Sequence, residues 1–440
     1  MKKNVLVCLF ETLGLSLERI NQLSAQTGFI KRSRKIKAVD FLIYMITESV
    51  RGCVSCNDLA ATIQFEAGTL ASRQAYHNKM GNASVCFFEA ILAIIMHAKT
   101  GVAIASKFRQ FKRILVQDST VIKLPAKLMD VFSGVKNAYT QVCNARIQCV
   151  YDLLSGSFTH WSMHPYSKND LSVANELHVR AGDLVLRDRG YFTAKESRRI
   201  IEANGEFVSR YKHKTTLYDP QTGQELDLLR LLKTQRSLDR KGLIGKEDRV
   251  EVRIIAAEVS QETASRRRQK AKKESRGHNP GKEVLFLMGW TIFFTSLTRK
   301  DLDINDFLEL YGLRWRIETI FKTWKSHFNF DKIHTVGENQ LRLILMARFI
   351  AITLFYEKIY VPLSKRVARK SDKKLSLMKL MRYISRNLRA IPQLLRAACG
   401  STKNLKIVEK YCTYDKRKRL NYAEKELQIL TAIETIGNLS

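Results

Sequence analysis

Residues 182–211, GDLVLRDRGYFTAKESRRIIEANGEFVSRY, constrain the fold more than any other stretch of the chain. The apolar run at 184–186 predicts a buried strand, and Thr193 and Glu196 have the spacing of a capping box at a helix start. EFVSRY then predicts a second strand. Strand, turn, helix and strand in this order indicate an α/β core, in which helices cover a sheet.

The neighbouring segments extend this core. RILVQDSTVIKLP (113–125) is strand-like, and NARIQCVYDLLSGSFTHWSMHP (144–165) predicts two strands joined at Ser155-Gly156-Ser157. DRVEVRIIAAEV and EVLFLMGWTIFFTSL predict further buried strands, separated by the basic run SRRRQKAKKESRGHNPGK. We therefore expect a helical N-terminal domain at 1–105, a core at 106–210 and 298–338, a β-rich insertion with a basic segment at 211–297, and a helical C-terminal region at 339–440.

The charge of the chain indicates a polyanionic partner. Lys and Arg number 75 against 42 Asp and Glu, a formal net charge of +33, but charge alone does not separate nucleic acid from an anionic membrane. ASRQAYHNKM (71–80), which follows the basic run IKRSRKIK, is compatible with a helix-turn-helix that reads DNA and equally with an ordinary amphipathic helix. On the first interpretation the N-terminal domain binds DNA.

The sequence argues against a membrane span and against disulfide bonds. The most apolar stretch, LRLILMARFIAITLFYEKIYV, is interrupted by Arg342, Arg348 and Glu357, so we expect a buried core helix. The eight cysteines of the chain are sparse and irregularly spaced, which favours free thiols in a reducing compartment. We expect a cytoplasmic protein.

The segment LYGLRWRIETIFKTWKS (310–326) holds a single acid among bases. On a helical wheel its tyrosine, acid and bases share one face, beside an apolar stripe that would dock the helix. Taken alone, this face is explained by i,i+4 ion pairs worth only tenths of a kcal/mol each, roughly 0.2–0.5. The polar residues are Tyr311, Arg314, Glu318, Lys322 and Lys325, and the apolar stripe is Leu310, Ile317, Phe321, Trp324 and Phe328.

Two aspartates give Glu318 a different meaning. Asp118 and Asp188 each follow an apolar run, at the predicted C-terminal end of a buried strand, where α/β sheets place ligands. Either one alone is also explained as a turn or cap residue. Three carboxylates brought together repel one another, and a divalent cation relieves that repulsion. Oxygen-only ligands favour Mg²⁺ or Mn²⁺, and two such ions catalyse phosphodiester chemistry.

The spacing YxxRxxxExxxxxxK at Tyr311, Arg314, Glu318 and Lys325 resembles the DDE transposases of bacterial insertion sequences, in the IS-four family defined by a Y-R-E-K signature. QDST and LRDRGYF resemble the two aspartate motifs of that family. The resemblance covers roughly residues 111–335. It implies an RNase H-like catalytic core with a mostly β insertion between the second Asp and the Glu.

The resemblance also implies roles for residues. Asp118, Asp188 and Glu318 would be the catalytic metal ligands. Tyr311, Arg314 and Lys325 would contact phosphates of DNA, and Lys322 would add to them. Trp290, which lies 28 residues before Glu318, resembles the Trp that stacks on a flipped base in this family. A Trp in an apolar strand is as readily a core residue, and both interpretations stay open.

Our hypothesis is a transposase that binds the terminal inverted repeats of an insertion sequence, cleaves double-stranded DNA with a divalent metal, and joins the 3′-hydroxyl to target DNA. It would act as a homodimer on DNA and associate with the nucleoid. One alternative is a non-catalytic DNA-binding regulator derived from such an enzyme. Another is an RNase H-like nuclease without strand transfer.

Overall fold

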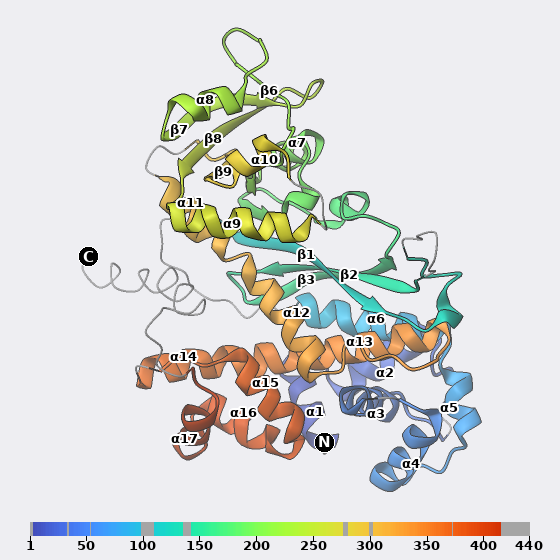
Figure 1. The fold of residues 1–440 in the computed structure, drawn as a ribbon. Coiled ribbons are helices and arrows are strands. Elements are labelled where there is room, and N and C mark those ends of the chain that lie inside the picture. The colour runs from blue at the N-terminus through green and yellow to red at the C-terminus, as the bar shows by residue number, and fades with distance from the viewer. Residues whose placement is uncertain are drawn as a thin grey trace.

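The computed structural model describes residues 3–32, 35–52, 54–97, 110–134, 142–275, 280–298, 302–371 and 373–414. Within these residues one mixed sheet of nine strands forms the upper part of the molecule in Figure 1, and helices from both ends of the chain pack in the lower part. The strands are β1 (Arg113–Lys123), β2 (Asn144–Asp152), β3 (Ser157–Pro165), β4 (Asp183–Arg187), β5 (Glu206–Arg210), β6 (Leu217–Tyr218), β7 (Ser237–Ile244), β8 (Val250–Glu258) and β9 (Trp290–Thr295).

The strand order in the sheet is β3-β2-β1-β4-β5-β9-β8-β7-β6. β4 runs parallel to both of its neighbours, β1 and β5, and the other neighbouring pairs are antiparallel. The parallel ladder of β1 and β4 ends at the pair Gln117 and Arg187. β9 pairs with β5 on one side and β8 on the other. The strands after residue 211 therefore continue the sheet that begins with β1 to β5.

The elements that the local sequence patterns predict around β4 are present in the structure. β2 and β3 are the predicted hairpin, and Gly156 in their turn has a φ of +69°, a conformation that favours glycine. Helix α7 (Ala194–Glu202) lies between β4 and β5 in the chain, and its N-cap Thr193 accepts a hydrogen bond from the backbone N–H of Glu196. The Glu196 carboxylate pairs with the Arg187 guanidinium instead of completing the capping box.

Two elements differ from their prediction. The apolar run before Trp290 is helix α10 (Lys282–Leu287) rather than the start of a strand, because a short apolar run alone does not distinguish a strand from a buried helix. The helix expected across 310–326 is two helices, α11 (Ile304–Gly312) and α12 (Trp315–His327).

The break between α11 and α12 is a tight turn. The backbone N–H of Leu313 donates to the carbonyl of Leu310, and that of Arg314 donates to the carbonyl of Tyr311, both over 3.1 Å. These bonds join residues three apart, as in a 3₁₀-helix, and Gly312 lowers the helix propensity at this point. Tyr311 and Glu318 consequently lie on different helices.

The C-terminal and N-terminal helices meet along α13 (Glu338–Phe355), which confirms the core helix predicted there. Arg348 on α13 is fully buried, and its guanidinium donates to the carbonyls of Ser49, Gly52 and Asn329, so the charge is satisfied inside the core. The other helices at the two ends are α1 (Lys3–Glu11), α2 (Leu17–Gln26), α3 (Ala38–Arg51), α4 (Cys56–Ala67), α5 (Arg73–Lys79), α6 (Asn82–His97), α14 (Val361–Lys370), α15 (Leu377–Arg386), α16 (Ile391–Cys399) and α17 (Thr402–Tyr411).

No single helix of the described residues is long and apolar enough to cross a membrane, although α5 and α6, bent by 66° at their junction, satisfy length and composition as a pair. The cysteines within the described residues have free thiols, as expected. Cys53 and residues 415–440 of the expected C-terminal region lie outside the described residues.

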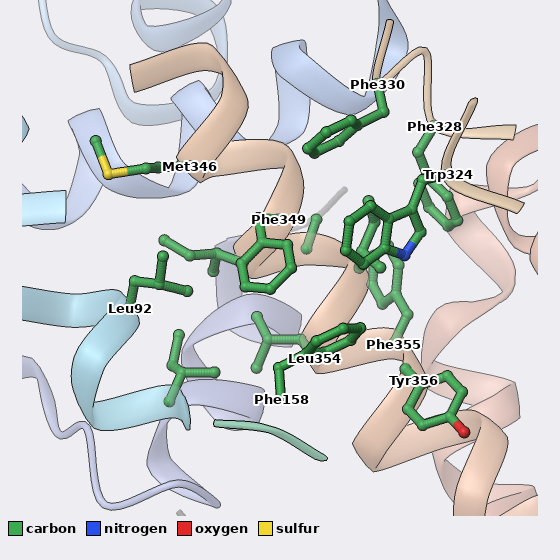
Figure 2. Close-up of a cluster of buried hydrophobic side chains, with 14 of the residues drawn as sticks. Leu92, Phe158, Trp324, Phe328, Phe330, Met346, Phe349, Leu354, Phe355 and Tyr356 are labelled. Carbon is green, nitrogen blue, oxygen red and sulfur yellow. The ribbon is translucent and has the colours of Figure 1, made fainter. Parts of the chain in front are cut away.

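Helix α12 is anchored by an aromatic cluster (Figure 2). The ring of Trp324 lies 5.3 Å from Phe158 on β3, 5.0 Å from Phe330 and 5.2 Å from Phe349 on α13, measured between centroids. Trp324 is 1% exposed, and the whole predicted stripe on this segment is buried. These ring contacts pack α12 against β3 on one side and α13 on the other.

Candidate active site

Asp118 and Asp188 lie side by side at the end of the parallel ladder. Each directly follows a member of the last register pair, Gln117 on β1 and Arg187 on β4. Asp188 follows the end of its strand as predicted, but β1 continues beyond Asp118 to Lys123, because β2 pairs with it along that whole length. The prediction that Asp118 ends its strand was therefore wrong. What ends there is the pairing with β4.

The alternation of side chains along β1 gives the direction of Asp118. Ile114 and Val116 belong to the core cluster that includes α12 and α13, and Leu115 belongs to the cluster on the other face. Asp118 has the same parity as Ile114 and Val116, so it points toward α12. The same parity along β4 turns Asp188 toward that side.

Arg314 joins two of the three predicted acids. Its Nη1 donates to Oδ2 of Asp118 over 3.1 Å, and its Nη2 donates to Oε1 of Glu318 over 2.7 Å. Arg314 is 6% exposed. This arginine was predicted to contact phosphate, and in the structure its guanidinium neutralises carboxylates.

Tyr311 and Lys325 fasten the two helices to the strands that carry the aspartates. The Tyr311 hydroxyl donates to the carbonyl of Arg187 over 3.1 Å, and the Lys325 ammonium donates to the carbonyl of Val121 over 2.7 Å. Tyr311 thus bonds to the residue before Asp188, and Lys325 bonds to β1 three residues after Asp118. Lys322 is exposed at the surface of α12.

The environment of Asp118 favours its protonated form. Burial raises the pKa of Asp118 to about 7, although the Arg314 guanidinium and the backbone N–H of Ser119 lower it. The charges of Glu318 and Asp188 raise it further, so the three acids act on one another electrostatically. A cation brought to this place would favour the ionised form of Asp118.

The oxygen-only donors of the three acids suit a hard divalent cation such as Mg²⁺ or Mn²⁺. Their mutual repulsion, visible at Asp118, is the electrostatic condition that such a cation relieves. In the arrangement seen here, no three His, Cys, Asp or Glu side chains among the described residues gather closely enough to hold a metal ion. Arg314 provides the positive charge between Asp118 and Glu318.

A cluster of arginines beside Asp188 was missed by the sequence reasoning. Arg210, at the end of β5, lies with its guanidinium carbon 6.0 Å from the centre of the Tyr311 ring. Burial lowers the pKa of Arg210, and the positive charges of Arg267 and Arg189 lower it further. Arg189 could have been found from its position next to Asp188. Arg210 and Arg267 are brought there by β5 and by helix α9 (Gln261–Glu274), which only the fold reveals.

Trp290 begins β9 and is 4% exposed. Its ring centroid lies 6.4 Å from that of Phe286, and its carbonyl accepts a hydrogen bond from Arg267 over 2.9 Å. The packing agrees with the core interpretation. Stacking on a base would require the ring to become accessible.

The predicted helix-turn-helix segment forms helices α4 and α5, joined by a turn in which Gly68 has a φ of +67°. On α5, Gln74 bonds to Asn78, and Lys79 donates to the carbonyl of Phe29. Recognition of DNA by this segment stays a prediction.

The family described as "Transposase DDE domain" matches residues 109–354, more than half of the chain and the whole candidate site. The chain is 26% identical over 412 residues to the transposase for insertion sequence element IS231D of Bacillus thuringiensis subsp. finitimus, covering 85% of this chain and 86% of that protein. It is 24% identical over 390 residues to the transposase for insertion sequence element IS1151 of Clostridium perfringens, covering 82% and 81%.

Among solved structures, a piggyBac transposase synaptic complex with hairpin DNA matches with a TM-score of 0.43 and 10% identity, over 95% of this chain and 87% of that one. The family match spans both aspartates, the arginine that bridges two of the acids, and the helix that carries the third. The chain belongs to the family of transposases with a DDE domain.

Proposed function

We propose that this protein is a transposase that binds the terminal inverted repeats of an insertion sequence and catalyses metal-dependent DNA cleavage and strand transfer. One observation carries the proposal: Asp118 and Asp188 stand next to each other at the end of the parallel ladder, and Arg314 ties Glu318 to Asp118. Membership of the DDE transposase family supplies the reaction class. It also disfavours the alternative of a non-catalytic regulator, since all three acids are present.

We infer that β1 to β5 form an RNase H-like core. The strand order β3-β2-β1-β4-β5, with β1, β4 and β5 parallel to one another and β2 antiparallel to both of its neighbours, β1 and β3, supports this inference. On this division the region 211–297 is the insertion, and it adds β9, β8, β7 and β6 to the edge at β5. The helices on either side in sequence would be the N-terminal DNA-binding domain and the C-terminal region.

Asp118, Asp188 and Glu318 would hold Mg²⁺ or Mn²⁺, as two ions in the complete complex. A bound ion makes a water or a 3′-hydroxyl nucleophilic and stabilises the leaving oxygen. In the protein alone, Arg314 holds Asp118 and Glu318 in place. Once the acids are neutralised by metal, its guanidinium would be released from part of this task and could contact a DNA phosphate, as the resemblance implies.

DNA would reach the acids along the arginines beside them. Arg189 is exposed next to Asp188, and Arg210 and Arg267 add positive charge beside it. The charges of Arg267 and Arg189 lower the pKa of Arg210, so a phosphate backbone would relieve this repulsion. Lys322 would extend this surface along α12. Tyr311 and Lys325 already bond to strand carbonyls, so their first task would be to position the helices.

The decisive experiment mixes purified protein with Mg²⁺ and a DNA that carries the element's ends, and follows cleaved and joined products. Wild type should give both products, whereas Asp188→Asn and Glu318→Gln should lose them while still binding the ends. Equal cleavage by wild type and Asp188→Asn would overturn the proposal. Cleavage without joined products would favour the nuclease alternative, and sedimentation of the end complex tests the expected homodimer.

A further inference from the structure

Asp170 lies on the opposite face of the sheet from Asp118, directly before the short helix η2 (Leu171–Glu176). Its Oδ1 accepts three hydrogen bonds: from the Ser119 hydroxyl over 2.9 Å, from Arg146 Nη1 over 2.7 Å, and from Gln148 Nε2 over 3.1 Å. Ser119 is the residue after Asp118. A single carboxylate oxygen thus holds β1 and β2 from behind the candidate site.

The same network reaches the turn that follows Asp188. The Tyr191 hydroxyl donates to Oε1 of Gln148 over 2.7 Å, and Tyr191 is 1% exposed. At Gly190, a side-chain carbon would stand 3.4 Å from Oδ2 of Asp170, so this carboxylate lies directly against the turn. Asp170 therefore contacts, on its two oxygens, the segments that carry Asp118 and Asp188.

Arg146 makes the network rigid. Its guanidinium donates to Asp170, to the Ser119 hydroxyl over 3.1 Å and to the carbonyl of Lys168 over 3.0 Å. It also lies over the Tyr166 ring, 4.7 Å from the centroid. A planar group held at so many points has little freedom left, so the position of Asp170 is fixed relative to β1.

We propose that Asp170 is a positioning residue that sets the spacing of Asp118 and Asp188 and thereby the affinity of their site for divalent metal. The proposal rests on the proposed function, in which those aspartates are metal ligands. The residues behind metal ligands orient them, and their loss weakens metal binding by roughly 10- to 100-fold in other sites. Here the support acts through Ser119 on one side and through Gly190 and Tyr191 on the other.

The test compares Asp170→Asn with a matched control, Asp183→Asn. Asp183 is buried, is the first residue of β4 and pairs with Arg113. It therefore lies at the end of β4 that is away from Asp188. Mn²⁺ binding is measured from the electron paramagnetic resonance signal of the free ion. Cleavage of end-bearing DNA is followed against Mn²⁺ concentration, and folding by thermal unfolding.

For Asp170→Asn we expect Mn²⁺ binding weakened about 10-fold or more, and a matching rise in the Mn²⁺ concentration for half-maximal cleavage, with the rate at saturating Mn²⁺ largely retained. Asp170→Glu should restore part of the affinity. Asp183→Asn should lower the unfolding temperature and leave the Mn²⁺ dependence unchanged. An unchanged Mn²⁺ affinity in Asp170→Asn, or an equal shift in Asp183→Asn, overturns the proposal.

If Asp170→Asn does not fold, Tyr191→Phe decides, because it removes only the hydroxyl that donates to Gln148. A several-fold weakening of Mn²⁺ binding supports the proposal, and wild-type affinity contradicts it. Asp188→Asn distinguishes a failure of the proposed function from a failure of the role of Asp170. If it binds Mn²⁺ and cleaves like wild type, the proposed function fails; if it is inactive while Asp170→Asn is normal, only the role of Asp170 fails.

Discussion

Arg314 and Asp118, 196 positions apart in the sequence, form an ion pair of 3.1 Å that brings the start of α12 onto the middle of β1. The other arm of the same guanidinium contacts Glu318, one helical turn further along. Without metal, the protein thus neutralises two of its acids with its own arginine. The proposed contact of Arg314 with a DNA phosphate would therefore belong to a different stage of the reaction from this structural role.

Replacing Arg314 tests this division. In Arg314→Ala the carboxylates of Asp118 and Glu318 lose their shared donor, so we expect the metal-free protein to lose about 1–3 kcal/mol of stability. Mn²⁺ should stabilise this variant more than wild type, because the ion neutralises the repulsion between Asp118 and Glu318 that Arg314 no longer compensates. Thermal unfolding with and without Mn²⁺ measures both effects. Equal stabilisation of the two proteins by Mn²⁺ would contradict the account.

Lys is a poor replacement for Arg314. A single ammonium lacks the fork that reaches two carboxylates, so Arg314→Lys should keep only part of the stability and lose about 10²-fold or more in cleavage. Cleavage of end-bearing DNA at saturating Mg²⁺ measures this loss. Wild-type rates in Arg314→Lys would show that the fork is not required.

The sequence predicted those parts of the fold that depend on local patterns. The strand, helix and strand at 182–211 are short, capped and apolar on the expected side, and they formed as β4, α7 and β5. Asp118 was placed at a strand end because its own segment shows only where the apolar run stops. That β1 continues depends on hydrogen bonds from β2, which are nonlocal.

The candidate site was predicted in its acids but not in its supports. Tyr311 and Arg314 satisfy a helical wheel, yet the turn after Gly312 separates them, and their partners are a strand carbonyl and two acids. Asp170 has no sequence signal, because its partners come from two other strands and a turn. Such contacts exist only once the chain has folded.

Trp290 offers a test between its two interpretations. As a core residue its replacement by Ala should cost about 3–5 kcal/mol, whereas Trp290→Phe should cost less and leave end binding and cleavage intact. Chemical denaturation and the cleavage assay on Trp290→Phe give the answer. A stable Trp290→Phe protein that fails to cleave would favour base stacking over packing.

Glu357 predicts a pH dependence of stability. It is 1% exposed, neither carboxylate oxygen has a hydrogen-bond partner among the described residues, and burial raises its pKa to about 8. Because the folded state holds this proton more tightly than the unfolded chain does, the group destabilises the fold progressively as the pH rises from about 4.5 to about 8.

Replacing Glu357 by Gln should remove this penalty. The variant should match wild type near the low end of that range and exceed it above the high end by a few kcal/mol, on the order of 1 kcal/mol per pKa unit. Urea unfolding of both proteins at pH values near 4.5 and above about 8 measures the difference in their free energies of unfolding. Glu338→Gln is the control, because Glu338 is half-exposed at the start of α13 and paired with Arg342, so its replacement should give no comparable gain. An equal gain in both variants would rule out burial as the cause.

Arg189 should contribute to DNA binding as a phosphate contact. It is exposed beside Asp188, and its charge acts on the half-buried Arg210, so a DNA backbone at the acids would meet it early. At low salt, Arg189→Gln should weaken binding to end DNA and to unrelated DNA by the same factor. It should also reduce the slope of the logarithm of the binding constant against the logarithm of the salt concentration by about 0.9.

The control is Arg198→Gln, because Arg198 is also exposed but forms an ion pair with Asp248 and donates to the carbonyl of that residue. Fluorescence anisotropy over a salt series, with end DNA and with a scrambled duplex, gives the slope for each protein. Wild-type slopes are expected for Arg198→Gln. If Arg189→Gln also keeps the wild-type slope, the DNA backbone does not pass beside Asp188, and its route must run instead along α12, past the exposed Lys322.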